Sequence, residues 1–149
     1  MFEGATALSL DAKGRLAIPA KQRGPLSAVA EGALVLTAHP HRCLLLYPAP
    51  AWLPIREQIL KASSLDPKAA PIKRVLVGNA RTEELDSAGR ILIAPELRAY
   101  AQLEKTVYLV GMGSHFEIWN EAAWKEQNNL AADLMSSGEL PGCFGDLSL

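Results

Sequence analysis

Residues 11–19 read Asp-Ala-Lys-Gly-Arg-Leu-Ala-Ile-Pro, and residues 86–95 read Asp-Ser-Ala-Gly-Arg-Ile-Leu-Ile-Ala-Pro. The two stretches begin 75 residues apart (86 − 11), which is about half of the 149-residue chain. A sequence that repeats at a fixed offset contains copies of one structural unit. The repeat also places an arginine, Arg15 or Arg90, at the same position of each copy. The pattern therefore predicts a tandem architecture with two equivalent arginines.

Each copy of this motif predicts a β-hairpin. Leu8 and Leu10 alternate with Ser9, and Leu16 and Ile18 alternate with Arg15 and Ala17. A period of two is typical of half-buried strands. In the second copy, Leu85, Ile91 and Ile93 stand at the corresponding positions. Asp11, with Gly14 three positions later, suits a type I turn in which the glycine takes a left-handed conformation. Asp86 and Gly89 repeat this spacing. Both motifs therefore predict a three-residue hairpin loop with a glycine bulge, followed by a strand that begins with arginine.

The repeat continues beyond the hairpin. Trp52 is matched by Trp124, and Leu46-Tyr47 by Ile118-Trp119, both at an offset of 72. Each copy is then expected to contain a strand, a tight turn, a second strand, a short helix, two strands and a helix. We divide the chain into a first repeat at 7–50, connecting helices at 51–78, a second repeat at 79–122, and a C-terminal helix and tail at 123–149.

Prolines and glycines set the expected helix limits. Pro19 and Pro95 are expected to open short helices, because proline is tolerated in a first helical turn. Gly24-Pro25 is expected to end the first of these helices early. The last helix is expected to begin at Asn120. Its residues predicted to be buried are Trp124, Ala131, Leu134 and Met135.

Neither half is long enough to form a comfortable core of its own. We therefore expect the two copies to interlock around a pseudo-twofold axis and to share one core. The predicted class is α+β, mainly β, with flanking helices. Hydrophobic residues make up 49% of the chain, which is enough to build such a core.

The sequence predicts a protein inside the cell. No apolar run approaches the roughly 20 residues needed to span a bilayer, and the stretch 1–4 lacks the basic and apolar regions of a signal peptide. Cys43 and Cys143 lie far apart, and nothing in their spacing requires a disulfide. We expect a cytoplasmic protein with reduced cysteines and no membrane partner.

Charge is divided unequally between the halves. Residues 1–74 carry 10 Lys/Arg and 5 Asp/Glu, a net charge of +5, whereas residues 75–149 carry 5 and 11, a net charge of −6. Such asymmetry favours a basic binding surface in the first half. The acidic excess is equally consistent with solvated helices in the second half.

The Asp-x-x-x-Arg pairs are the strongest candidates for a functional site. A structural interpretation is that Asp11 and Asp86 cap their turns while the arginines form surface ion pairs worth about 0.2–1 kcal/mol. The functional interpretation is DNA binding, because arginine makes bidentate contacts to guanine and a two-stranded β-ribbon fits the major groove. Duplication at equivalent positions favours the second interpretation.

The predicted DNA-binding residues are basic and lie in or after the two turns. They are Arg15, Arg90, Lys13, Lys21 and Arg23, and the residues that support the motifs are Asp11, Gly14, Asp86 and Gly89. Four of the five basic residues cluster around the first motif, whereas the second is flanked by acidic residues. Because phosphate contacts dominate affinity, the first copy is expected to contribute most of the binding.

The sequence gives little support for metal binding or catalysis. His39, His41 and Cys43 could ligate a metal, but Pro40 intervenes and no fourth ligand is near in sequence. The chain has no Gly-x-Ser-x-Gly, Walker-type phosphate loop or His-Glu-x-x-His motif. We therefore expect no metal, no cofactor and no enzymatic activity.

The chain resembles the MraZ family over nearly its whole length. The resemblance rests on Met1-Phe2, on residues 10–19, on Val77-Gly78-Asn79-Ala80 and on residues 85–93, and a tandem pair of Asp-x-x-x-Arg motifs is specific to that family. The resemblance implies two SpoVT/AbrB-type half-domains that form a swapped-hairpin β-barrel. It also implies a ring-shaped homo-oligomer on the nucleoid.

The same resemblance implies a function. It predicts binding to short direct repeats in the promoter of the division and cell-wall gene cluster that includes the regulator's own gene, with repression as the expected outcome. Glu3 departs from the family, which usually has a basic residue near that position, and Ala94 stands where a second proline is common. The alternative function is an antitoxin-like or other protein-interaction module, whose tail from Gly138 to Leu149 engages a partner.

Overall fold

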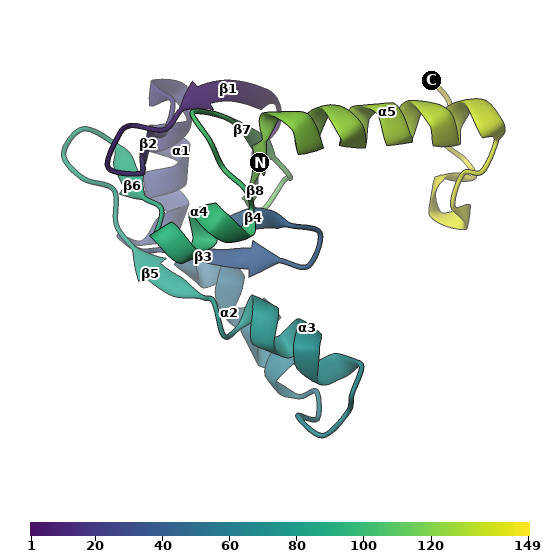
Figure 1. The fold of residues 1–149 in the computed structure, drawn as a ribbon, viewed down its shortest axis with the longest axis horizontal. Helices are drawn as coiled ribbons and strands as arrows, with labels where there is room; N and C mark the ends of the chain where they lie inside the picture. The colour runs from purple at the N-terminus through teal and green to yellow at the C-terminus, as the bar shows by residue number, and fades with distance from the viewer.

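The computed structural model describes residues 1–149. The first copy contains β1 (Ala5–Ser9), β2 (Arg15–Ala17), α1 (Ala20–Ala30), β3 (Leu34–His39), β4 (Cys43–Pro48) and α2 (Ala49–Leu60). After α3 (Ala69–Leu76), the second copy contains β5 (Arg81–Glu83), β6 (Arg90–Leu92), α4 (Pro95–Tyr100), β7 (Thr106–Gly111), β8 (Phe116–Asn120) and α5 (Glu121–Ser137). A 3₁₀ turn, η1 (Gly142–Phe144), lies in the tail. The predicted order of elements is confirmed in both copies (Figure 1).

The strands of the two copies interlock. Six of them form one antiparallel sheet in the order β1-β7-β8-β4-β3-β5, and β2 pairs with β6 in a separate two-stranded ribbon. The pairs β1–β7, β4–β8, β3–β5 and β2–β6 each join one copy to the other. The equivalent strands of the two copies are β1 and β5, β3 and β7, and β4 and β8. When each strand of the six-stranded sheet is replaced by its equivalent, the order becomes β5-β3-β4-β8-β7-β1, which is the observed order read backwards. The predicted pseudo-twofold arrangement is therefore confirmed.

A closed barrel is not confirmed. The six-stranded sheet is open, because β1 and β5 form its edges and do not pair with each other. The ribbon of β2 and β6 stays separate and only three residues long on each strand. Pro19 and Pro95 follow its strands closely, and proline cannot donate to a β-ladder. The fold is α+β, mainly sheet, with two sheets in place of one continuous barrel.

One hydrophobic core draws on both copies. Its first-copy members are Phe2, Leu16, Ile18, Leu26, Ala30, Leu34, Leu36, Ala38, Leu44 and Leu46. Its second-copy members are Ile91, Ile93, Leu97, Ala101, Val107, Leu109, Phe116 and Ile118. Since each copy supplies only about half of this cluster, neither could bury its own apolar face alone.

Two smaller clusters cover the other face of the six-stranded sheet. Trp52 of α2 packs against Tyr47 of β4, with the ring centroids 5.6 Å apart. Near the start of α5, Trp119 packs with Val110 and Cys43. Strand β4 is therefore covered on both faces, which explains its unbroken run of buried residues.

The predicted early end of α1 is wrong. The helix continues to Ala30 with Pro25 inside it, although an interior proline costs about 3 kcal/mol. Leu26 and Ala30, which follow the proline, are buried in the shared core. This packing outweighs the local cost. Pro95 opens α4 as predicted, whereas Pro19 precedes α1 as its N-cap residue.

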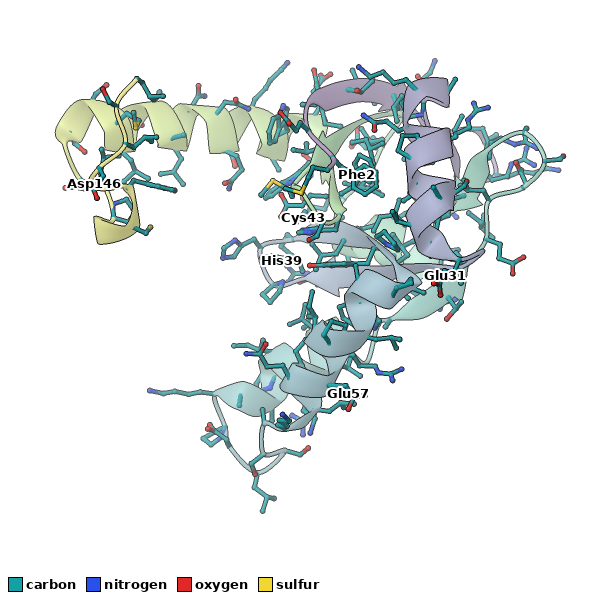
Figure 2. All side chains as sticks on the ribbon, turned by 180° about the vertical axis from the view of Figure 1, so that it is seen from behind. Phe2, Glu31, His39, Cys43, Glu57 and Asp146 are labelled. Atoms are coloured by element: carbon teal, nitrogen blue, oxygen red, sulfur yellow. The ribbon has the colours of Figure 1, made fainter.

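The predicted burial of α5 is wrong for Ala131, Leu134 and Met135, which are exposed, whereas Trp124 is partly buried and stacks on Tyr108. The helix begins as expected, because the Asn120 side chain accepts a hydrogen bond from the Ala123 N–H at 2.7 Å. It then projects away from the body (Figure 1), and none of its residues is buried. Leu130 is 51% exposed, and Asp146 lies in the tail beyond the helix, away from Phe2 and Cys43 (Figure 2). None of the helices has the length and apolarity required to cross a membrane.

Candidate nucleic-acid interface

The first turn is organised around the Asp11 carboxylate. Its Oδ1 accepts the backbone N–H groups of Lys13 and Arg15, each at 2.9 Å. Its Oδ2 accepts the Arg15 Nε–H at 2.7 Å. The Gly14 N–H donates to the Asp11 carbonyl at 3.0 Å, and Gly14 has a φ of +80°. The predicted turn with its left-handed glycine is therefore confirmed, and one carboxylate fixes both the loop and the arginine.

The second turn repeats this geometry. Asp86 Oδ1 accepts the N–H groups of Ala88 and Arg90, each at 2.9 Å, and its Oδ2 accepts the Arg90 Nε–H at 2.8 Å. Gly89 has a φ of +74°. Since the distances around the two carboxylates agree to within 0.1 Å, the repeated sequence produces a repeated structure.

Hydrogen bonding to the ionised form lowers the pKa of both aspartates. For Asp11, the Arg15 backbone N–H lowers the pKa most, followed by the Arg15 guanidinium and the Lys13 N–H. Partial desolvation opposes these effects, and the pKa falls from 3.8 to about 2. The Arg90 backbone N–H is likewise the main reason that the pKa of Asp86 is lowered. Both carboxylates are ionised at neutral pH, so each remains paired with its arginine.

The two arginines share the outward face of the ribbon. In the β2–β6 register, Arg15 lies opposite Leu92, and Ala17 lies opposite Arg90. The residues between these pairs, Leu16 and Ile91, are buried in the core. Arg15 and Arg90 are therefore diagonal neighbours on one face, at a Cα separation that is generally about 7–8 Å. The ribbon lies at the opposite side of the molecule from the far end of α5 (Figure 1).

The terminal nitrogens of these arginines have no hydrogen-bond partner in the protein. The only side-chain hydrogen bond of Arg15 uses Nε, and the same holds for Arg90. In each guanidinium the two Nη groups therefore form a free fork, and the aspartate holds its plane. This arrangement can donate two parallel hydrogen bonds to one planar acceptor pair.

Arg23 lies at the second turn, although its sequence position groups it with the first. Its guanidinium covers Gly89, where an added Cβ would lie 2.6 Å from its Cζ, and its Nε–H donates to the Ile18 carbonyl at 2.6 Å. Arg98 occupies the equivalent position over Gly14. The expectation that Arg23 strengthens the first motif is therefore wrong, because the interlocked strands carry it to the other end of the ribbon.

Arg98 is not among the predicted DNA-binding residues, because its sequence position groups it with the second motif, where acidic residues such as Glu96 oppose the basic ones. The structure places it at the first turn. A signal was present, because Arg98 lies 75 residues after Arg23, the same offset as between Arg15 and Arg90.

The two predicted lysines lie on the surface. Lys13 is exposed at the tip of the first turn, where the second turn has Ala88. Lys21 is exposed in the first turn of α1. Neither side chain forms a salt bridge or hydrogen bond within the protein. Both are therefore available to an anionic ligand.

The histidine and cysteine candidates form a structural group. The His39 and His41 rings lie 4.7 Å apart, and the His41 N–H donates to His39 Nδ1. Burial raises the pKa of the Cys43 thiol to about 12, so it stays protonated at neutral pH and packs as an apolar group. No group of three or more His, Cys, Asp or Glu side chains is placed to hold a metal ion.

Comparison with known proteins places the chain among related sequences. The family model described as "MraZ protein, putative antitoxin-like" matches residues 1–75 and again residues 76–138. The chain is 78% identical to the transcriptional regulator MraZ of Dechloromonas aromatica over 149 residues, which cover all of both chains. It is 60% identical to the protein of the same name from Methylobacillus flagellatus over 127 residues, covering 85% of this chain and 86% of the relative. Identity to the Nitrosomonas europaea protein of that name is 48% over 141 residues, or 95% of each chain.

Proposed function

The chain belongs to the MraZ family, and on that premise we propose that it is a sequence-specific DNA-binding transcriptional regulator. The relatives from Dechloromonas aromatica and Methylobacillus flagellatus are named as transcriptional regulators. The observation that carries the proposal is the outward face of the ribbon, on which Arg15 and Arg90 are diagonal neighbours with free Nη forks.

The ribbon supports direct reading of bases. A two-stranded antiparallel ribbon fits the major groove, and the O6 and N7 atoms of guanine accept a bidentate arginine fork. Asp11 and Asp86 hold the forks before DNA arrives, so little side-chain freedom is lost on binding. Lys13 and Lys21 are placed to contact phosphates, which supply affinity without sequence information. This mechanism contains no catalytic step.

Self-association is the second part of the proposal. The ring-shaped homo-oligomer and the direct repeats follow from the family resemblance, whereas the division into repeats at 7–50 and 79–122 follows from the internal repeat of the sequence. Exposed apolar residues on and beyond α5 support an interface there, and they are Leu130, Leu134, Met135, Leu140 and Phe144. Several ribbons in one ring would engage successive DNA repeats at a high effective concentration.

The gene target also follows from the resemblance. We propose that the regulator represses the division and cell-wall cluster that includes its own gene, and that it acts in the cytoplasm at the nucleoid. Direct repeats suit a ring, because neighbouring subunits present their ribbons in the same orientation.

A protein-interaction module is the second candidate function. The antitoxin-like description of the family model and the exposed apolar residues of the tail favour it. A pull-down with the full chain and with a chain lacking residues 138–149 separates the two functions. DNA binding by the ribbon is expected to survive the deletion, whereas capture of a partner through the tail is expected to be lost.

Arg15→Ala tests the proposed function. We expect its affinity for the gene's own upstream DNA to fall about tenfold or more, to the level of an unrelated duplex, because one guanine fork is lost. Gel-shift titrations at several salt concentrations measure this change, and light scattering checks that the oligomer is intact. Arg74→Ala removes an exposed arginine from α3 and is the matched control. Unchanged affinity of Arg15→Ala for the upstream DNA would overturn the proposal.

A further inference from the structure

Arg23 and Arg98 occupy equivalent positions and reach across the repeat. Each is the fourth residue of its helix, α1 or α4, and the two lie 75 residues apart. Each covers the turn glycine of the other copy, and neither forms a salt bridge within the protein. This exchange follows from the pairing of β2 with β6, which brings each helix start to the opposite turn.

At the first turn, three contacts connect Arg98 to the loop. The Ile93 N–H donates to the Gly14 carbonyl at 2.9 Å. The Ile93 carbonyl accepts the Arg98 Nε–H at 3.0 Å. The guanidinium then lies against Gly14, where an added Cβ would be 2.6 Å from Cζ and 2.9 Å from Nη1. The side chain is thereby fixed at the backbone of the loop that carries Lys13 and leads into Arg15.

The second turn has the equivalent contacts, with the roles of the two copies exchanged. The Ile18 N–H donates to the Gly89 carbonyl at 2.9 Å, and the Ile18 carbonyl accepts the Arg23 Nε–H at 2.6 Å. The guanidinium of Arg23 covers Gly89. Both arginines use Nε for the protein, and their Nη groups have no protein acceptor.

A partly exposed guanidinium that is fixed through Nε and free at Nη is suited to a phosphodiester oxygen. At the first turn, this cation lies in the same loop region as Lys13 and Arg15. We propose that each turn is a composite anion site, in which Arg98 binds a DNA backbone phosphate at the first turn and Arg23 binds one at the second. The assignment rests on the proposed function, and it makes each copy a positioning element for the arginine of the other.

Phosphate-ethylation interference on the gene's own upstream DNA tests this assignment. The wild type is compared with Arg98→Gln, Arg23→Gln and Lys13→Ala. We expect Arg98→Gln to lose interference beside the phosphates that Lys13→Ala also loses, because both groups belong to the first turn. Arg23→Gln is expected to lose a separate set. Each arginine variant should bind roughly fivefold more weakly, and the slope of log affinity against log salt should fall by about 0.9.

Arg74→Gln is the matched control, because it removes the same charge from α3, at an exposed position away from both turn glycines. Its interference pattern should match that of the wild type. The assignment is overturned if Arg98→Gln leaves the pattern unchanged, or if Arg23→Gln loses the phosphates of Lys13. If the wild type binds upstream and unrelated DNA equally, the proposed function itself fails.

Amide hydrogen exchange without DNA tests the positioning role separately. The Ile93 N–H should exchange faster in Arg98→Gln, and the Ile18 N–H faster in Arg23→Gln, because each variant loses the contact that holds the opposite turn. Arg98→Lys keeps the charge and should show the same faster exchange while retaining part of the salt dependence. Unchanged exchange at both amides in proteins with wild-type thermal unfolding would overturn the positioning role.

Discussion

The first and second turns have the same geometry and different electrostatics. Both use one aspartate to hold two backbone N–H groups and one arginine, at distances that agree within 0.1 Å. The tip of the first turn carries Lys13, and that of the second carries Ala88. The direction of each arginine and the strength with which its turn attracts an anion are therefore set by different groups. Hydrogen bonds aim the arginines, and the surrounding charges decide how strongly each turn attracts an anion.

The largest expected effect comes from breaking the shared geometry at the glycines. Gly14→Ala and Gly89→Ala should each lower the free energy of unfolding by about 1–3 kcal/mol, because an alanine is strained at positive φ and its Cβ displaces an arginine. Urea unfolding measures both. Gly32→Ala is the matched control, since Gly32 has a φ of +85° with open space around its Cβ position. Equal losses in all three variants would mean that arginine packing contributes nothing.

A smaller effect is expected from exchanging the tip residues. Lys13→Ala should weaken DNA binding roughly two- to fivefold and lower the salt slope by about 0.9. Ala88→Lys should strengthen binding by a similar factor, because it adds a positive charge two residues from Arg90, which shares the outward face of the ribbon with Arg15. Fluorescence anisotropy over a range of salt concentrations measures both. An Ala88→Lys variant that binds like the wild type would show that the second turn does not contact DNA.

The smallest expected effect is the loss of folding stability at acidic pH. The pKa of Asp11 falls from 3.8 to about 2 on folding, so its ionised form stabilises the folded state. That contribution is complete above about pH 4 and is lost as the pH falls toward 2. The stability gap between the wild type and Asp11→Asn should therefore narrow from pH 5 to pH 2, and thermal unfolding across that range measures it. The pKa of Asp86 is lowered too, so Asp86→Asn should show the same sign. A gap that widens in acid would contradict the expectation.

Local sequence was sufficient to predict the turns. An aspartate and a glycine at fixed spacing specify a hairpin loop through contacts within five residues, so Asp11 and Gly14 could be interpreted without knowledge of the fold. The offset of 75 also predicted that the copies interlock, since neither has enough apolar surface alone.

Contacts between the two copies could not be predicted from the local sequence. Arg23 was assigned to the wrong turn because charge counting follows the chain, whereas the β2–β6 pairing exchanges the helix starts. Pro25 was expected to end α1, but burial of Leu26 and Ala30 decided otherwise. The apolar residues of α5 were expected to be buried because periodicity reports an apolar stripe without naming what covers it.

The exchange of strands between copies also has a consequence for synthesis. Strand β1 leaves the ribosome well before its partner β7, because Ala5 pairs with Val110, 105 residues later. At about 5–20 residues per second, roughly 5 to 20 seconds separate the two strands. During that interval, β1 and the first hairpin have no partner strand, and contacts of such long range are slow to form. Before the second repeat has been synthesised, the strands of the first repeat are therefore most exposed to mispairing with another chain.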